Sequence, residues 1–194
     1  MIKYLSRKIV FISVLVPVLF IQSCSSSKRS TVKYRVASNP DIILKNSTRK
    51  SNVAARTINT KNVSVDSLVD FAETLTGIRY KYGSTNPSQG FDCSGFITYV
   101  FNHFNIKVPR SSVEFTNAGT PVDPYKSKRG DLILFTGSDT TGIIVGHMGI
   151  ITENKKGNIR FIHAASGNGK GVMVSGMSSY FFIRFVKVIR VFNE

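Results

Sequence analysis

The spacing of apolar residues changes once along the chain, near Gly130. Upstream of it, apolar positions recur every three or four residues in two stretches, which is the spacing of amphipathic helices. The first stretch spans 65–75 and is followed by Gly77, a residue type that often ends a helix. The second lies within 93–105 and consists of Phe96, Ile97, Val100, Phe101 and Phe104. We therefore predict two helices in this part of the chain.

Beyond Gly130 the apolar residues form short runs rich in Val, Ile and Phe, and turn residues separate these runs, which is the pattern of strands. The runs are 131–136, 146–152, 158–164, 171–175 and 185–192. The second and third are joined by 153–157, whose composition is that of a hairpin loop. Helices followed by strands predict an α+β domain with an antiparallel sheet over residues 65–194.

The N-terminus predicts export. Basic residues precede an apolar run over 9–21, and this run of 13 residues is shorter than the roughly 20 that a spanning helix needs. The run ends in Ile21-Gln22-Ser23-Cys24, and these features together predict a signal peptide over 1–23. Cys24 resembles the cysteine of a bacterial lipobox, which would make it the lipidated mature N-terminus. The alternative is an ordinary signal peptide that is cut nearby.

Most of the positive charge belongs to a linker and not to the folded domain. The chain carries a net charge of +15, and residues 24–64 contain nine basic residues against Asp41 alone. A nucleic-acid binder would concentrate its charge on the folded domain with interleaved aromatic residues, so nucleic acid is not expected as a partner. We predict a basic, flexible linker near an anionic lipid or wall polymer.

Cys93 has the surroundings of an activated thiol. Asp92 stands where a helix N-cap is expected, which puts Cys93 in the first helical turn. Free backbone amides and the helix dipole there would favour the thiolate, which is the nucleophilic form. Lipidation of Cys24 would leave Cys93 without a disulfide partner, and catalysis is a reason to keep such a thiol free after export. The alternative is a small buried residue under the helix.

Of three histidines, two suit a catalytic role. His103 is expected late on its helix, about 15 Å along the axis from the first turn, and so belongs to the helix surface. His147 and His163 lie in two consecutive predicted strands. If the loop between these strands centres on Lys155, the two histidines stand directly opposite each other on one face of the sheet.

Packed against the helix of Cys93, this face would combine a nucleophile, a base and an orienting group. His147 would take the thiol proton, and His163 would hold the His147 ring in the productive tautomer. Each histidine alone has the alternative of a partly buried polar residue. A zinc site is a further alternative, but paired metal-ligand spacings such as C-x-x-C are absent from the sequence. We expect no metal and no organic cofactor.

Five short motifs together resemble the NlpC-type cell-wall peptidases, a family of papain-like cysteine enzymes. They are Tyr80-Lys81-Tyr82-Gly83-Ser84, Phe91-Asp92-Cys93-Ser94-Gly95-Phe96, Pro109-Arg110-Ser111, Gly130-Asp131-Leu132 and Gly146-His147-Met148-Gly149-Ile150. The resemblance covers residues 65–194 and implies Cys93 as nucleophile, His147 as base and His163 as the orienting residue.

The resemblance also implies sites near the substrate. The Tyr80 hydroxyl would lie close to the oxyanion, and further positions along the substrate groove are Asp92, Ser94 and Arg110. Ser84 departs from the family pattern, which usually has a glycine there, and the stretch 137–142 could modify access to the groove.

The function implied by the resemblance is that of a murein endopeptidase, which hydrolyses an amide of peptidoglycan stem peptides or cross-links through a thioester on Cys93. Peptidoglycan and a membrane, reached through the lipid on Cys24, are the expected partners of a monomer. The predicted location is the cell envelope, anchored in the outer membrane and facing the periplasm. Two alternatives remain: a wall-binding lipoprotein without activity, and a transferase or amidase with the same acyl-enzyme chemistry.

Overall fold

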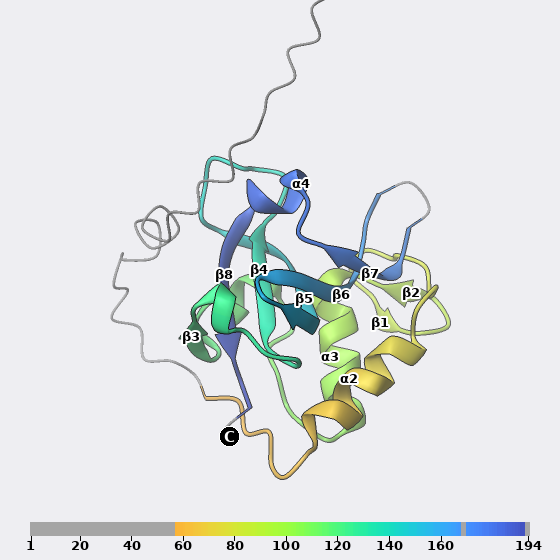
Figure 1. Cartoon of the computed structure of the whole chain (residues 1–194). Coiled ribbons are helices and arrows are strands. Elements are labelled where there is room, and N and C mark those ends of the chain that lie inside the picture. The colour runs from red at the N-terminus through yellow and green to blue at the C-terminus, as the bar shows by residue number, and fades with distance from the viewer. Residues whose placement is uncertain (1–56, 168–169, 193–194) are drawn as a thin grey trace, which may run out of the picture. The chain divides into compact units, whose positions relative to one another are not determined.

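The computed structural model describes residues 57–167 and 170–192. In this part of the chain, helices pack around one central sheet (Figure 1). Within the same ranges, no helix is long and apolar enough to cross a membrane. The predicted signal peptide, the predicted lipidation site Cys24 and the predicted linker up to residue 56 lie outside the described residues.

Two helices form where the apolar spacing predicts them. α2 spans Val65–Thr74 and begins after Ser64, whose hydroxyl accepts a hydrogen bond from an amide of the first turn. α3 spans Cys93–His103 and begins after Asp92, whose Oδ1 accepts from the Gly95 amide at 2.5 Å. Side-chain caps of this kind satisfy amides that a helix start leaves free, which is why both helices begin at these residues.

The strands of the second half form an antiparallel sheet with the order β3-β8-β4-β5-β6-β7. They are β3 (Thr120–Val122), β4 (Leu132–Thr136), β5 (Val145–Lys155), β6 (Asn158–Ala164), β7 (Val172–Gly176) and β8 (Phe185–Arg190). The prediction of an α+β fold with an antiparallel sheet is confirmed. The apolar pattern does not reveal β3, because this strand is short and contains Pro121. A proline is tolerated there because β3 lies at the edge of the sheet.

The remaining elements are short. They are β1 (Thr85–Asn86), β2 (Gly90–Phe91), the 3-10 segments η1 (Ser112–Asn117) and η2 (Pro124–Lys126), and α4 (Ser179–Phe182). β1 and β2 pair just before α3, and α4 is a single turn that connects β7 to β8.

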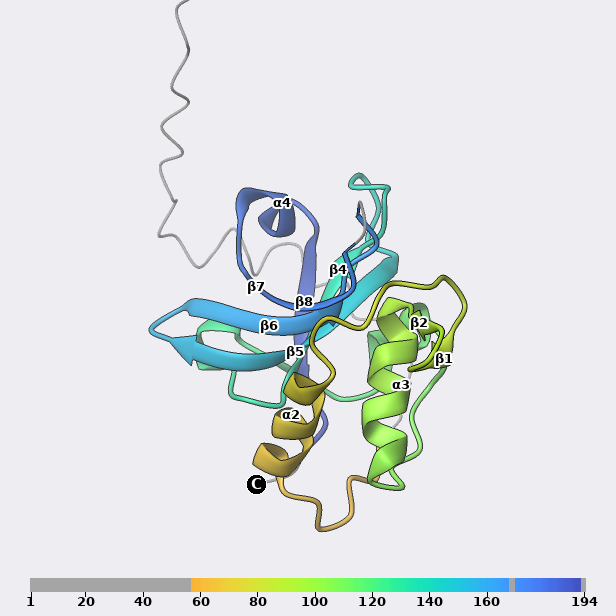
Figure 2. The same ribbon diagram turned by 90° about the vertical axis from the view of Figure 1, so that its right-hand side faces the viewer.

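Both faces of the sheet are covered, as the edge-on view of Figure 2 shows. α2 and α3 lie on one face, where the larger core joins α3 residues such as Phe96 to Met148 of β5. α4 lies on the other face, above a smaller aromatic cluster that includes Phe135, Phe161 and Phe181. The sheet therefore separates two apolar cores.

Packing extends to the N-terminal side of α2. Ile58 and Thr60 are both buried, and Ile58 belongs to the core on the α2–α3 face. The last residues of the predicted linker therefore contribute side chains to the folded unit.

Candidate active site

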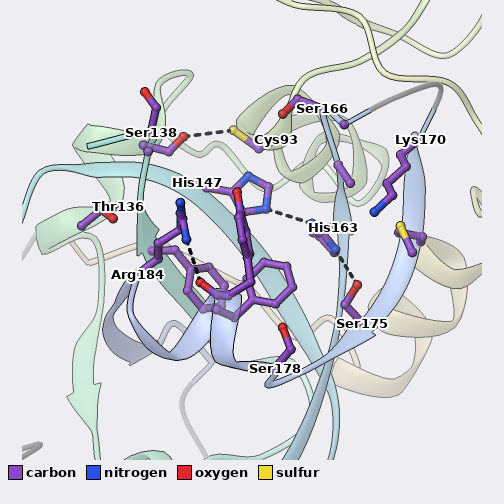
Figure 3. A pocket seen from close by; sticks show the side chains of 18 of the residues that line it. Cys93, Thr136, Ser138, His147, His163, Ser166, Lys170, Ser175, Ser178 and Arg184 are labelled. Atoms are coloured by element: carbon purple, nitrogen blue, oxygen red, sulfur yellow. Dashed lines mark hydrogen bonds between the residues drawn. The ribbon is translucent and has the colours of Figure 1, made fainter. Parts of the chain in front are cut away.

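A cleft of about 720 Å³ extends over the α4 face of the sheet to the N-terminus of α3 (Figure 3). Cys93, His147 and His163 all line it, so the fold brings together the three residues that the sequence predicts as catalytic. Tyr80, another predicted site residue, also lines it. The described part of the chain holds no cluster of His, Cys, Asp or Glu side chains suited to a metal ion.

Cys93 is held at the start of α3 by the chain segment before it. The Asp92 amide donates a hydrogen bond to the Ser84 carbonyl oxygen at 3.1 Å. A Cβ on Gly95 would collide with that same oxygen, so only glycine permits this close approach. The Cys93 side chain is buried, and its Sγ lies 3.7 Å from the carbonyl oxygen of Gly146 on β5. The thiol therefore lies where α3 meets the beginning of β5.

Burial favours a neutral thiol at Cys93. Loss of water around the thiol raises the pKa of Cys93, and the charge of Asp92 raises it further. The backbone amides of Ser94 and Cys93, together with the charge of Arg110, act in the opposite direction without cancelling the rise in pKa. The amides at the helix start favour the thiolate as predicted, but burial and the charge of Asp92 outweigh them, so the thiol needs a base.

A chain of hydrogen-bonded side chains leads away from the thiol. His147 Nε2 lies 2.8 Å from His163 Nδ1, and His163 Nε2 lies 3.0 Å from the Ser175 hydroxyl (Figure 3). If each histidine donates its Nε2–H along this chain, His147 Nδ1 keeps a lone pair that can accept the thiol proton. The opposite direction of donation would protonate Nδ1 and remove the base. In the productive tautomers the Ser175 hydroxyl therefore accepts the hydrogen bond from His163 Nε2–H.

Burial also keeps both histidines neutral. It lowers the pKa of His147 to about 4. Burial is also the largest cause that lowers the pKa of His163 to about 3, followed by the charges of His147 and Lys170. At neutral pH His147 is therefore an unprotonated base. The pKa shifts favour a resting pair of neutral thiol and neutral imidazole.

The two histidines lie diagonally across strands β5 and β6. The register of these strands, continued by one residue, places His163 beside Gly149, two residues from His147. Residues two apart on a strand share a face, so both imidazoles project from the same side of the sheet. The predicted shared face is correct. The predicted direct opposition around Lys155 is wrong, because the turn consists of residues 156–157.

A β-bulge at Thr152 makes this shared face possible. At the hairpin end Lys155 pairs with Asn158, and if that register continued, His147 and His163 would point to opposite faces. The register shifts by one residue at Thr152, which has no partner across the strands. Since a one-residue shift moves a side chain to the other face, the bulge brings the two imidazoles together.

The histidines lie on the sheet face opposite to α3. The His147 ring lies 6.1 Å from the Phe135 ring and 6.4 Å from the Phe181 ring, measured between centroids, within the α4-side cluster. The prediction that the histidine face packs against the helix of Cys93 is therefore wrong. The thiol approaches the histidines because α3 begins beside Gly146, the residue before His147.

Asp92, Ser94 and Arg110 form a hydrogen-bonded cluster behind the thiol. Arg110 donates to both Asp92 carboxylate oxygens, at 3.1 and 2.7 Å, and to the Ser94 hydroxyl at 3.0 Å. These three residues are not among those that line the cleft. In this structure they support the start of α3, because Asp92 also caps the helix.

Tyr80 occupies a position suited to a hydrogen-bond donor. Its hydroxyl pKa is raised, first by burial and then by the charges of Cys93 and Asp92, so the phenol keeps its proton at neutral pH. Tyr80 and Cys93 line the same cleft, and Tyr80 pairs with Phe91, two residues before the thiol.

Other residues of the cleft carry little signal in the sequence. Ser175, Phe181 and Arg184 all line it, but a lone serine in a strand or an arginine before a strand has no pattern that marks a site. Gly137 and Ser138, from the stretch predicted to modify access, also line the cleft.

Comparison with known proteins identifies the family of this fold. Residues 77–190 match the sequence profile described as the NlpC/P60 family. The match covers more than half of the chain, so this protein belongs to the NlpC/P60 family. The prediction of an NlpC-type domain is confirmed.

Named relatives support this assignment. The chain is 33% identical over 132 residues to the gamma-DL-glutamyl hydrolase of Bacillus subtilis strain 168, an alignment that covers 67% of this chain and 30% of that protein. It is 33% identical over 137 residues to murein DD-endopeptidase MepS/murein LD-carboxypeptidase of Escherichia coli strain K12, covering 69% of this chain and 67% of that one. A solved structure, the NlpC/p60 domain of peptidoglycan hydrolase SagA, aligns with a TM-score of 0.53 at 30% identity, over 66% of this chain and 99% of that domain.

Proposed function

We propose that this protein is a peptidoglycan endopeptidase that hydrolyses an amide bond of stem peptides or cross-links. The observation that carries the proposal is the hydrogen-bonded chain of His147, His163 and Ser175 in the same cleft as the free thiol of Cys93. Relatives named as a murein endopeptidase and a peptidoglycan hydrolase support the choice of substrate. Acyl transfer through a thiol needs no metal or organic cofactor.

The first half of the reaction forms a thioester. The Cys93 proton moves to His147 Nδ1 as Sγ bonds to the amide carbonyl carbon, and the carbonyl oxygen takes up the electron pair. An amide N–H at the start of α3 and the Tyr80 hydroxyl stabilise this oxyanion. The C–N bond then breaks, and the leaving nitrogen takes the proton from His147.

The second half of the reaction hydrolyses the thioester and releases the carboxylic acid product. Water gives a proton to His147 Nδ1 while its oxygen bonds to the thioester carbon. The C–S bond breaks, and Sγ recovers its proton from His147. His163 acts through hydrogen bonding to Nε2 of His147 and does not itself touch the substrate.

The residues hydrogen-bonded at the start of α3 have a proposed role of their own. Arg110, held by Asp92 and Ser94, carries a positive charge next to the start of α3. In the proposed function these three residues lie near the substrate groove, as the family resemblance implies, and Arg110, whose side chain is the exposed one, contacts the substrate. Arg110→Gln would then raise KM more than it lowers kcat, and an unchanged KM would count against this contact.

Digestion of purified peptidoglycan with the full chain tests the function. The wild-type protein should release soluble muropeptides, which mass spectrometry identifies. Cys93→Ala should release none while keeping its far-UV circular dichroism and melting temperature, because alanine fits the first turn of α3. Release by a folded Cys93→Ala protein at the wild-type rate would contradict the enzyme assignment and favour a wall-binding protein.

The proposed location is the cell envelope. A signal peptide over 1–23, a lipid on Cys24 and a basic linker over 24–64 would tether the peptidase domain of 65–194 to the periplasmic side of the outer membrane. A lipid attached to the N-terminal cysteine binds a protein to the membrane without a spanning helix. Intact-mass analysis of the mature protein should show an acylated Cys24. An unmodified N-terminus there would refute the anchor.

A further inference from the structure

The charges along the cleft have one sign. Among the described residues that line it, Lys170 and Arg184 are the only Lys or Arg side chains, and none is Asp or Glu. His147 and His163 line it as neutral groups, because burial lowers the pKa of each well below 7. A cleft with this charge pattern favours an anionic ligand over a cationic one.

Arg184 is fixed in position without a carboxylate partner. Its Cζ lies 3.8 Å from the centroid of the Tyr180 ring, and its Nη1 donates to the Tyr180 carbonyl oxygen at 3.1 Å. Its Nε is buried and has no hydrogen-bond partner among the described residues. None of the ion pairs in the described part of the chain includes Arg184.

The Arg184 guanidinium is preorganised to bind an anion. The Tyr180 ring holds the guanidinium plane, so little side-chain entropy remains to be lost on binding. A guanidinium without a carboxylate partner gains more from a new anion than one that is already paired. A carboxylate matches the planar guanidinium in shape and charge.

The proposed reaction places the amine half of the substrate beside His147. The leaving nitrogen takes its proton from His147, so the amine half must lie beside that ring while the acyl half stays on Cys93. Phe181 lies between Tyr180 and the histidines, with its ring 6.4 Å from the His147 ring and 5.5 Å from the His163 ring. Arg184 therefore lies on the histidine side of the cleft.

We propose that Arg184 binds a carboxylate on the amine half of the substrate, so that this protein prefers amides whose leaving amino acid keeps a free carboxylate. The inference rests on the proposed function, because it uses His147 to define the amine side. It adds a specificity residue for the leaving group.

Binding to a set of three peptides tests the proposal without turnover. The probes are a peptidoglycan stem pentapeptide with free carboxylates and two forms of it, in which either the carboxylate of the diamino acid side chain or the C-terminal carboxylate is an amide. Calorimetry with the full-length Cys93→Ala protein measures the dissociation constant of each. One of the two amides should bind about tenfold more weakly than the parent peptide, as expected for loss of one charge-assisted hydrogen-bonded pair.

Variants assign the preference to one side chain. In the Cys93→Ala background, Arg184→Gln should bind the parent peptide and the disfavoured amide equally, and Arg184→Lys should keep part of the difference. Lys107→Gln removes an exposed charge that does not line the cleft and should keep all of it. The comparison of peptides on Cys93→Ala alone stands even if an Arg184 variant fails to fold.

The outcomes separate this inference from the proposed function. Equal binding of all three peptides, no binding of the parent peptide, or an unchanged preference in a folded Arg184→Gln protein would overturn the carboxylate site. Release of muropeptides by the wild-type protein would still uphold the endopeptidase. Absence of that release would overturn the proposed function, and the inference with it.

Discussion

At the scale of residues, the proton relay depends on which nitrogen carries each hydrogen. His147 can accept the thiol proton at Nδ1 only when its Nε2–H points to His163. His163 can accept that hydrogen at Nδ1 only when its own Nε2–H points to Ser175. In the proposed function His147, His163 and Ser175 therefore act as one unit, in which only His147 exchanges a proton with the thiol.

Substitutions at His163 should distinguish an orienting role from a chemical one. His163→Asn or His163→Gln offers an amide oxygen to the Nε2–H of His147 and should keep measurable kcat. His163→Ala removes the acceptor and should lower kcat by roughly 10²-fold, whereas His147→Ala should be nearly as inactive as Cys93→Ala. Initial rates on one defined muropeptide decide this. A nearly wild-type His147→Ala protein beside an inactive His163→Ala protein would reverse the assignment.

Ser175 should act through the tautomer of His163. Ser175→Ala leaves the His163 Nε2–H without its acceptor and should lower kcat several-fold with little effect on KM, because the substrate does not depend on this hydroxyl. Ser175→Thr keeps the hydroxyl and serves as the matched control. Nitrogen chemical shifts of the imidazoles, measured in wild type and Ser175→Ala, report the tautomer directly. Identical shifts and rates in both proteins would argue against this role.

At the scale of elements, the β5–β6 pair depends on Gly149. A Cβ there would lie 2.8 Å from the Ile162 carbonyl oxygen and 3.2 Å from the His163 Cβ. Gly149→Ala should therefore destabilise the fold by about 1–3 kcal/mol and reduce activity by displacing His163. Gly176→Ala is the matched control, because its Cβ would have 3.9 Å to its nearest neighbour in the same sheet. Equal melting temperatures of the two variants would contradict this packing argument.

The same strands show what sequence patterns reveal and what they omit. Short apolar runs predict β5 and β6, and a loop centred on Lys155 would place both histidines on one face. The apolar runs do not reveal the bulge at Thr152, because a single extra residue leaves the apolar pattern almost unchanged. The direct opposition around Lys155 was therefore wrong while the shared face was correct. The face was predicted correctly because two changes of the strand register compensate. The turn lies further along the chain than predicted, and the bulge at Thr152 shifts the register by one residue.

Motifs that mark a family are not all parts of its site. Asp131 belongs to the motif of residues 130–132, yet it lies buried just before β4, where Arg190 donates to both of its carboxylate oxygens at 2.8 Å. Ser175 and Arg184, by contrast, line the cleft but lie in no recognisable motif. Residues such as Ser175 and Arg184 can be assigned to the cleft only from the three-dimensional structure.

At the scale of the whole molecule, the buried histidines should make stability depend on pH. In an unfolded chain a histidine has a pKa near 6.5, whereas folding lowers the pKa of His147 to about 4 and that of His163 to about 3. As pH falls below about 6.5, the unfolded state therefore binds protons that the folded state does not, and the free energy of unfolding decreases.

Melting temperatures between pH 7.5 and 5 test this coupling. The wild-type protein should be most stable above pH 6.5 and lose stability steadily below it, before most carboxylates titrate. His163→Gln removes one buried titrating group and should show a shallower decline over the same range. A flat wild-type profile from pH 7 to 5 would show that the histidines titrate alike in both states.

The proposed nucleophile and base come from elements that pack on opposite faces of the sheet. The nucleophile belongs to a helix packed in one core, and the base belongs to a strand face packed in the other. If the departing amine binds beside Arg184 as proposed, mutations in the α4 segment should reshape its part of the cleft while the helix of Cys93 keeps its packing. Within such a fold, the choice of leaving group can evolve independently of the nucleophile. Grafting residues 177–184 between family members is then a route to enzymes that cut a different bond with an unchanged thiol.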